Sequence, residues 1–513
     1  MTDARGRDQP SHATPEGTAR YRARHPSIAG VALGRTGLTV SRLGFGCYRV
    51  DDETLIHRAA LERALTTGVN LIDTSTNYTD GGSERLVGAV LADLFASGRL
   101  RRDEVVVVSK MGYVQGQNLA LAEAREAAGR PFPEMVKYGD GIWHCLHPEF
   151  LADQLPRSLD RLRLPSLDVC LLHNPEYFLS DAAHRRAGTV EARREEFDRR
   201  LTEAFAFFEG RVAAGELHGY GVSSNTAAAP LIDPEATSLT RMLAAARTAG
   251  GEAHHFRLLQ LPMNLFESRA FSERKDGPEG RATVLEWAAG EGVGVLLNRP
   301  LNALVGRGLV RLADPPFDQA APPLETALAS VAALEAEYRR DVAGGIRLGP
   351  GSPAPTELFR WSEQLADLGG RLLGLTHWES IEGQVQGMVG QVVRAFDDGL
   401  AGESGARWQG WRRRYLPALG GLLGALRREA AAKSGGTRRA IADAIDPALP
   451  VERRGEPLSR KALWVLASTP GVSTVLLGMR RPAYVEDAGD VLTWAPLASV
   501  EPVYAAIRGL RLG

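Results

Sequence analysis

Cysteine is scarce in this chain of 513 residues, which has only Cys47, Cys145 and Cys170. Three scattered cysteines cannot build a disulfide framework, so we expect a reducing compartment and a cytoplasmic protein. Net charge is also nearly absent, at -1. This balance gives no electrostatic basis for binding nucleic acid or an anionic membrane surface.

Long apolar runs are missing as well. No uninterrupted stretch approaches the ~20 residues that are needed to cross a bilayer. Residues 1–30 are polar and rich in Arg, Pro and Ser, without the apolar segment of a secretion signal. We therefore expect a disordered leader over 1–30.

From residue 36 onward, short β-rich runs alternate with amphipathic helical stretches, a rhythm typical of βα units and a parallel sheet. The expected strands are Arg42–Tyr48, Asn70–Thr74, Glu104–Lys110, Leu167–His173, His218–Ser223, Leu258–Asn264, Val293–Asn298 and Ser473–Gly478. The expected helices include Glu84–Phe95, Phe150–Leu162, Thr240–Thr248, Ala282–Ala289 and Arg460–Ala467. The first strand lacks the third glycine of a G-x-G-x-x-G motif, which disfavours an open doubly wound sheet. We predict an α/β fold, a closed (β/α)8 TIM barrel.

Two insertions interrupt this rhythm. Residues 114–146 read as a Gly- and Pro-bearing loop, and 302–458 as a mostly helical insertion between 31–301 and 459–513, which form the barrel. Both follow strands and therefore lie at the C-terminal mouth of the barrel. The long insertion carries apolar stripes at helical spacing: Leu324, Leu328, Val331 and Tyr338; Ile381, Val385, Met388 and Val392; Trp408, Trp411, Tyr415, Leu419 and Leu423.

These stripes have three readings. They form a small core of their own, they pack on the barrel, or they bind a partner. Because a soluble protein rarely exposes large apolar patches, we hypothesise that 302–458 packs over the rim near Tyr78 and His173 as a cap that selects the substrate.

Four proton-active side chains, Asp73, Tyr78, Lys110 and His173, stand at or just beyond the ends of consecutive expected strands. Those ends converge at one mouth of a barrel. A lysine after four valines is expected to be buried, and a buried ammonium needs a partner such as Asp73. Singly, each has a structural explanation: Lys110 reaching the rim, a hydrogen-bonded His173, Asp73 capping a turn. Their combination favours an active site.

The surrounding motifs resemble the aldo-keto reductase superfamily over about 31–301 and 459–492. They are D-T-S-x-x-Y with G-x-S-E-x-x-x-G, then S-K and L-L-H at two strand ends. The resemblance implies an opening β-hairpin in GRTGLTVSRLGFG and reduction of an aldehyde or ketone, or the reverse alcohol oxidation, by NAD(P)H. Tyr78 would be the general acid, and His173 would orient the carbonyl. Free tyrosine titrates near ~10, and we expect Lys110, held by Asp73, to lower that pKa.

The same resemblance implies a cofactor site, with NADPH slightly favoured over NADH. Its expected residues are Ser223, Ser224, Asn225, Gln260, Asn298, Arg299, Gly478, Arg480, Arg481 and Asp487. The family's usual Ser-Asn pair for the nicotinamide carboxamide reads Ser223-Ser224 here. Asn298 stands where a stacking aromatic ring is common, and Arg299 has an equally good reading as a rim salt bridge.

A small carbonyl or alcohol substrate is expected at Tyr48, Trp143, His144 and Asn174. We expect no metal, because the H-C-L-H run at 144–147 has no second ligand pair. Two other functions remain open: a non-catalytic nucleotide-binding barrel with a regulatory or scaffolding role, and a lyase that forms a Schiff base through Lys110. The sequence leaves the oligomeric state open.

Overall fold

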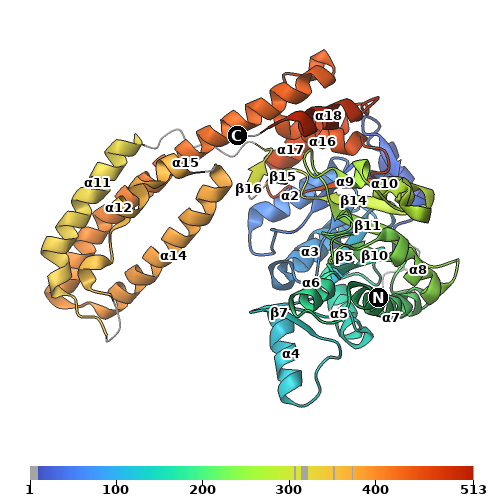
Figure 1. The fold of residues 1–513 in the computed structure, drawn as a ribbon, viewed down its shortest axis with the longest axis horizontal. Helices are drawn as coiled ribbons and strands as arrows, with labels where there is room; N and C mark the ends of the chain where they lie inside the picture. The colour runs from blue at the N-terminus through green and yellow to red at the C-terminus, as the bar shows by residue number, and fades with distance from the viewer. Residues whose placement is uncertain (1–9, 306–307, 314–321, 350–352, 373, 512–513) are drawn as a thin grey trace. The chain divides into compact units, whose positions relative to one another are not determined.

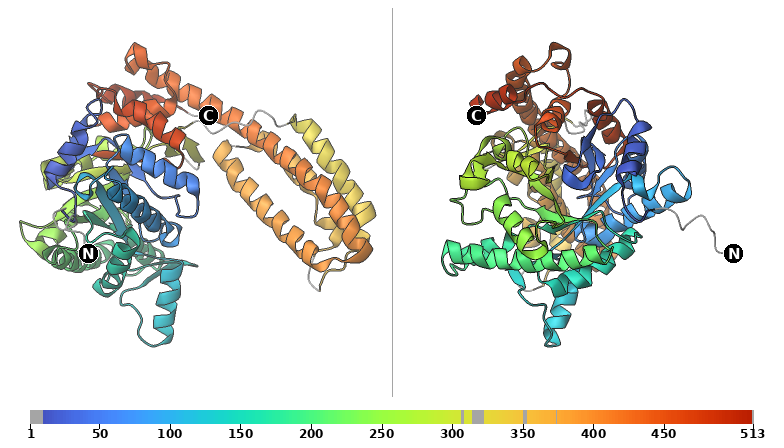
Figure 2. Two further views of the ribbon diagram at one scale, coloured as in Figure 1. Left: turned by 180° about the vertical axis from the view of Figure 1, so that it is seen from behind. Right: turned by 90° about the vertical axis from the view of Figure 1, so that its right-hand side faces the viewer.

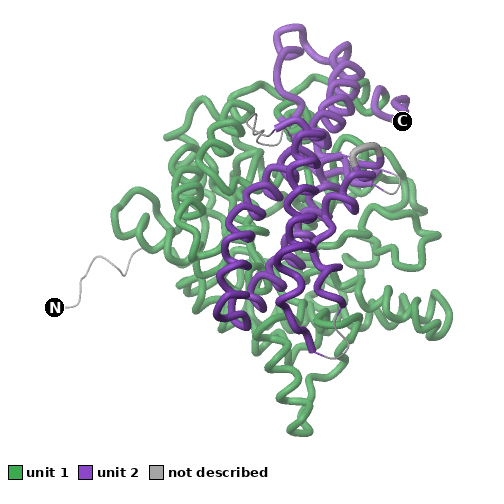
Figure 3. The backbone as a smooth tube through the Cα atoms, turned by 90° about the vertical axis from the view of Figure 1, so that its left-hand side faces the viewer, with its two compact units in different colours: residues 1–301, 460–505 green, residues 302–459, 506–513 purple. Residues whose placement is uncertain are grey.

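The computed structural model describes residues 10–305, 308–313, 322–349, 353–372 and 374–511. The chain divides into two compact units, drawn in two colours in Figure 3. Unit 1 consists of Met1–Leu301 and Arg460–Ala505, and unit 2 of Asn302–Ser459 and Ala506–Gly513. The last residues, which we expected in the barrel, therefore group with unit 2.

Unit 1 contains a closed barrel of eight parallel strands (Figure 1), which confirms the predicted fold class. Its strands lie in the expected segments of the sequence. In chain order they are β3 (Leu43–Gly46), β4 (Leu71–Asp73), β5 (Val106–Met111), β9 (Val169–His173), β10 (Tyr220–Ser223), β11 (Phe256–Pro262), β14 (Gly294–Asn298) and β17 (Thr474–Leu477).

Branched apolar side chains fill the barrel interior. Every residue of β5 and β9 is buried, as expected for parallel strands covered on both faces. Leu71, Val106, Leu171 and Leu258 meet in one core cluster. Gly221 is required by packing, because a Cβ there would lie 1.9 Å from the carbonyl oxygen of Leu258.

Helices surround the strands of unit 1. They are α2 (Leu55–Thr66), α3 (Gly82–Ala96), α5 (Pro148–Leu162), α6 (Tyr177–His184), α7 (Val190–Ala213), α8 (Leu239–Gly250), α9 (Arg269–Ser272), α10 (Val284–Gly290), α16 (Leu458–Ser468) and α17 (Pro482–Leu492). The helix α18 (Glu501–Gly509) begins in unit 1 and ends in unit 2. A short ribbon of β12 (Arg274–Asp276) and β13 (Ala282–Thr283) precedes α10.

The S-E pair of the motif has a structural role. Glu84 is fully buried in α3 and accepts hydrogen bonds from Ser109 of β5 and from Ser158 and Arg161 of α5. One carboxylate thus ties two helices to a barrel strand. Gly88 allows the close approach of α3 and α5, because a Cβ there would lie 2.4 Å from the carbonyl oxygen of Arg161.

The predicted disordered leader is wrong for residues 10–30. They include α1 (Pro15–Ala23), which Thr14 caps by accepting from the Gly17 N–H. Tyr21 is 1% exposed and donates to the carbonyl oxygens of Leu65 and Val69. These contacts to distant residues hold a segment that has no apolar stripe of its own. The expected hairpin is confirmed as β1 (Gly30–Ala32) and β2 (Thr39–Ser41).

The predicted loop over 114–146 is also wrong. It contains α4 (Gln117–Ala127) and a small antiparallel sheet of β6 (Tyr113–Val114), β8 (Ile142–His144) and β7 (Val136–Gly139). The alanine- and glutamate-rich run favours the helix, and the strands gain their hydrogen bonds only when the two ends of the segment meet.

Unit 2 has a hydrophobic core of its own. The elements of unit 2 include the hairpin β15 (Asn302–Val305) and β16 (Gly308–Arg311) and the helices α11 (Leu324–Glu337), α12 (Trp361–Ala366), α13 (Leu368–Arg371), α14 (Leu375–Gly399) and α15 (Gly402–Ile445). Its long helices, yellow to orange in Figure 2, lie side by side. In the described part of the chain, no helix has the length and apolar character that a membrane crossing requires.

The three predicted stripes of unit 2 pack against one another. Tyr338, Val385, Trp408 and Trp411 belong to one buried cluster, whereas Met388 is 48% exposed, against expectation. The stripes therefore need no barrel surface to cover them, and apolar burial gives no support for a cap. The cap itself stays a prediction.

Candidate active site

Asp73, Lys110 and Tyr78 meet at the C-terminal mouth of the barrel. They come from the ends of β4 and β5 and from the turn η3 (Tyr78–Gly81). Lys110 is fully buried, and its Nζ lies 2.7 Å from Asp73 Oδ2, 2.9 Å from the Thr74 carbonyl oxygen and 3.1 Å from Tyr78 Oη. An ammonium group has three hydrogens, so these contacts use all of them.

The proton of Tyr78 is therefore directed away from Lys110. Because Lys110 donates to Oη, the phenol accepts there and keeps its own O–H for another acceptor. Burial raises the pKa of Tyr78 well above its ordinary value, and the nearby Asp73 carboxylate raises it further. The expected lowering of this pKa by Lys110 is wrong for this structure, because desolvation outweighs the ammonium. Tyr78 is a protonated phenol at neutral pH.

His173, at the end of β9, completes the predicted group of four. Its ring centroid lies 5.7 Å from that of Tyr78, edge to face, and its Nδ1 lies 3.0 Å from Ser75 Oγ. Burial lowers the pKa of His173 well below its ordinary value, and Lys110 and His144 lower it further. The imidazole is therefore neutral and can offer one N–H or one lone pair to a ligand.

Polar side chains continue from Asp73 across the mouth. Gln260 of β11 donates to Asp73 Oδ1 at 2.7 Å and accepts from Ser223 Oγ of β10 at 2.9 Å. The side-chain Nδ2 of Asn298, on β14, donates to Gln260 Oε1 at 3.4 Å. Three predicted cofactor residues thus join Asp73 and Lys110 in one hydrogen-bonded line.

Three buried polar atoms near this line have no hydrogen-bond partner among the residues described: Asn298 Oδ1, Arg299 Nε and Glu176 Oε2. Arg299 also forms an ion pair of 2.9 Å with Glu267. Leaving such atoms unpaired costs about 1–3 kcal/mol each. Amide, hydroxyl and phosphate groups of a nicotinamide nucleotide could satisfy them, so these residues fit the expected cofactor.

The other cofactor candidates differ in their surroundings. Ser224 is buried, and its Oγ lies 2.8 Å from Thr237 Oγ1. The backbone N–H of Asn225 donates to Glu176.

Beyond β17, Gly478, Arg480 and Arg481 are exposed. Asp487 of α17 forms an ion pair of 2.7 Å with Arg460. This carboxylate therefore already has a cationic partner.

The expected substrate residues also differ in their surroundings. Tyr48 is 64% exposed, with its ring 5.3 Å from that of Tyr78, and His144 donates through Nε2 to the His173 carbonyl oxygen at 2.7 Å. Asn174 has a φ of 52° and donates through its backbone N–H to Ser223.

Trp143 and His144 have different surroundings, and a substrate role for Trp143 stays a prediction. Neighbouring residues of a strand point to opposite faces, and Trp143 of β8 packs beneath the Lys137 ammonium, 4.2 Å from its ring. It lines a small cavity together with Phe132 and Met135.

Two tyrosines that we did not predict stand beside His173. The ring of Tyr113, on β6, lies 4.7 Å from the His173 ring and 5.3 Å from the ring of Tyr177 of α6. Tyr177 stacks on His144. Tyr113 follows Lys110 by three residues along the chain, and Ser75, which contacts His173, lies inside the D-T-S-x-x-Y motif. For Tyr113 and Ser75, position relative to a strand end was the signal in the sequence that could have identified them.

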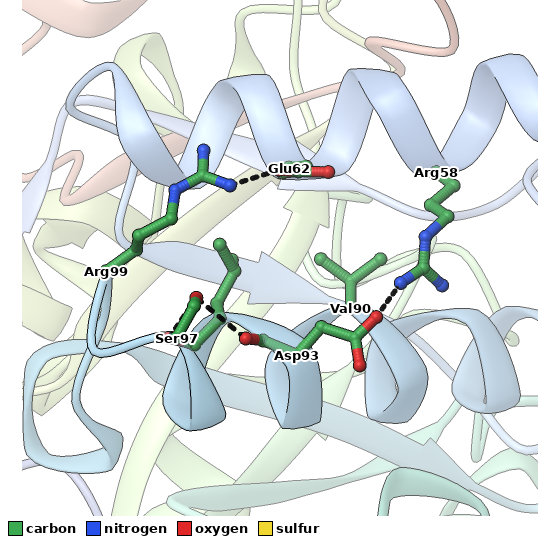
Figure 4. A pocket seen from close by; sticks show the side chains of 7 residues that line it. Arg58, Glu62, Val90, Asp93, Ser97 and Arg99 are labelled. Carbon is green, nitrogen blue, oxygen red and sulfur yellow. Dashed lines mark hydrogen bonds and ion pairs between the residues drawn. The ribbon is translucent and has the colours of Figure 1, made fainter.

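The crevice between α2 and α3 in Figure 4 is a separate feature. Its charged side chains are paired with one another, Arg58 with Asp93 and Arg99 with Glu62. With these charges neutralised, the crevice offers no set of groups that carries chemistry.

Comparison with known proteins finds relatives of part of this chain. Residues 42–231 match the model of the aldo/keto reductase family. An NADH-specific methylglyoxal reductase of Escherichia coli is 31% identical over 28% of this chain and 41% of its own. An NAD(P)H-dependent D-xylose reductase of Scheffersomyces stipitis is 25% identical over 37% and 50%.

The chain thus spans half or less of the length of these curated relatives. An aldo-keto reductase of Bacillus halodurans in its holo form aligns with 94% of this chain and 96% of its own, at 15% identity and a TM-score of 0.45. The closed barrel and the motifs agree with this match, and residues 42–231 are similar to the aldo/keto reductase family.

Proposed function

We propose that this protein is an NAD(P)-dependent oxidoreductase that reduces an aldehyde or ketone, or oxidises the corresponding alcohol. Tyr78 is the general acid for the carbonyl oxygen, and Lys110 and Asp73 position it. His173 orients the substrate. A small carbonyl or alcohol compound is the substrate, and the expected cellular compartment is the cytoplasm.

The observation that carries this proposal is the set of three hydrogen bonds that the Lys110 ammonium donates. Lys110 donates to Asp73, Thr74 and Tyr78, which leaves the phenol proton available to another acceptor. A raised pKa keeps that proton in place at neutral pH. A substrate oxygen that gains negative charge there would accept the proton, and positioned acids of this kind accelerate reactions by about 10²–10⁴.

The cofactor, when bound, supplies the hydride. Ser223, Gln260, Asn298 and Arg299 are the residues that would hold it, and the unpartnered atoms of Asn298 and Arg299 support this assignment. His173 is neutral and keeps a ring nitrogen for the substrate, and the ring of Tyr113 packs edge to face against its imidazole.

The two alternatives differ in what they require. A Schiff-base lyase needs a free amine, whereas every N–H group of Lys110 has an acceptor within 3.1 Å. A non-catalytic nucleotide-binding barrel does not need a positioned proton at Tyr78. The geometry therefore favours the reductase over both.

Titration with NADPH and with NADH tests the proposal before any substrate is known. The chain has eight tryptophans, and we expect saturable quenching of their fluorescence by at least one of the two nucleotides at micromolar concentration. The relatives include one named NADH-specific and one named NAD(P)H-dependent, so both belong in the test. The absence of saturable binding would refute the proposed function.

A further inference from the structure

Glu176 is a buried carboxylate that the proposed mechanism does not use. It follows β9, three residues after His173, and is 5% exposed. Its Oε1 accepts a hydrogen bond of 2.7 Å from the Asn225 N–H, directly beyond Ser223 and Ser224. Its Oε2 is buried without a hydrogen-bond partner among the described residues.

Among its neighbours, the Ser224 side chain acts on Glu176 as a hydrogen-bond donor that lowers the pKa of the carboxyl, while Oε2 itself has no partner within hydrogen-bond geometry among the described residues. The Ser224 hydroxyl lies 2.8 Å from Thr237. The titratable groups that act on this region are Glu235, from the loop before α8, and Tyr113 of β6. Glu235 is an acceptor like Glu176, and burial raises the pKa of Tyr113, so that phenol stays protonated. Burial also raises the pKa of Glu176 itself, to about 7.

We propose that Glu176 is a cofactor-binding residue whose Oε2 accepts a hydrogen bond from the amino group of the nicotinamide carboxamide. This inference rests on the proposed function. The family's Ser-Asn pair would supply an amide oxygen beside Ser223, and Ser224 cannot supply one. Glu176 reaches the same strand end from β9 and brings an unpaired acceptor there.

The affinity for the cofactor then depends on pH. The ionised carboxyl offers Oε2 as the stronger acceptor, because protonation at this oxygen removes the charge and adds an O–H that donates. If only the ionised form binds, affinity increases by roughly thirtyfold from about pH 5.5 to about pH 8.5, across a pKa near 7. This increase in affinity comes from the hydrogen bond to the nicotinamide carboxamide and not from the adenosine half of the nucleotide.

The experiment measures dissociation constants of NADH and NADPH at these two pH values. Glu176→Gln keeps an acceptor for Asn225 but does not titrate, so its affinities should vary at least about fivefold less with pH. NADH is the cleaner probe, because the 2′-phosphate of NADPH titrates near ~6. Glu235→Gln is the matched control: it removes a neighbouring carboxylate that raises the pKa of Glu176, so affinity should still increase with pH, with a midpoint at lower pH than in the wild type.

A second ligand keeps the test independent of any variant. The 3-acetylpyridine analogue of the cofactor has a methyl group in place of the amino group, and its affinity for the wild type should vary little with pH. An equal pH dependence for the analogue, or for Glu176→Gln, would overturn this inference while leaving the proposed function intact. Failure of both natural nucleotides to bind at either pH would refute the proposed function and this inference together.

Discussion

Lys110 and Asp73 form an ion pair that is almost fully removed from water. Breaking such a pair by removing one partner costs about 3–5 kcal/mol, because it leaves a buried charge. We predict that Lys110→Met lowers the free energy of unfolding by that amount and abolishes carbonyl reduction. Chemical denaturation and turnover measure the two effects.

The double variant Lys110→Met/Asp73→Asn separates them. It removes both charges, so most of the lost stability should return while turnover stays absent. Recovery of turnover in the double variant would show that Lys110 acts only on stability.

Glu176 also gives a prediction that needs no cofactor. A carboxyl whose pKa is raised by folding binds its proton more tightly in the folded state, so stability falls as pH rises from the unfolded pKa near ~4.5 through about 7. The loss reaches roughly 3 kcal/mol, at 1.36 kcal/mol per pKa unit. Relative to wild type, Glu176→Gln should therefore become increasingly stabilised between about pH 5 and pH 8. Thermal unfolding measures this difference. If the stability difference between Glu176→Gln and the wild type were constant over this pH range, it would contradict a raised pKa for Glu176.

The sequence predicted site residues that are recognisable by their side-chain chemistry, and it did not predict those that become recognisable only through their contacts in the folded chain. Asp73, Tyr78, Lys110 and His173 are proton-active and stand at strand ends, so both residue type and position were visible. Glu176 becomes distinctive only when the turn after β9 meets Asn225 across β10. The direction of the Tyr78 pKa likewise depends on the extent of burial, which spacing does not determine.

At the scale of elements, α3 and α5 depend on one carboxylate. Glu84→Ala removes the partner of Arg161 and of two serine hydroxyls, and we predict a loss of about 3–5 kcal/mol in the free energy of unfolding. Arg85→Ala is the matched control on the same helix. It breaks a half-exposed pair with Asp52, which is worth about 0–1 kcal/mol. Similar losses for the two variants would contradict the structural role of Glu84.

The predicted elements divide according to what stabilises them. The eight barrel strands were found because parallel strands that are buried on both faces need continuous apolar runs, as in β5 and β9. In contrast, α1 and β6–β8 were missed. Tyr21 holds α1 through carbonyl oxygens more than 40 residues away in the sequence, and short strands such as β6 exist only through their pairing. Local patterning carries no record of such contacts.

At the scale of the whole molecule, the chain has two units that bury separate cores. The apolar cluster of unit 2 lies between Ala327 and Ala431, and the barrel closes on itself without it. We predict that replacing 313–436 with a Gly/Ser linker leaves a folded barrel that binds nicotinamide nucleotide with unchanged affinity. Circular dichroism and nucleotide titration measure both properties.

The same deletion tests the predicted cap. Comparison of kcat/KM for a small aldehyde and a bulky ketone should show a changed ratio if 302–458 selects the substrate. An unchanged ratio in a folded deletion variant would reject the cap.

The most direct test of the account is hydride transfer by the wild type and by Tyr78→Phe. Oxidation of NADPH or NADH should be followed with a panel of small aldehydes that includes methylglyoxal, together with nucleotide affinity. We predict turnover by the wild type, a decrease of about 10²–10⁴ in Tyr78→Phe, and equal nucleotide binding by the two proteins. Near-normal turnover by Tyr78→Phe would contradict the central claim that this phenol is the proton donor.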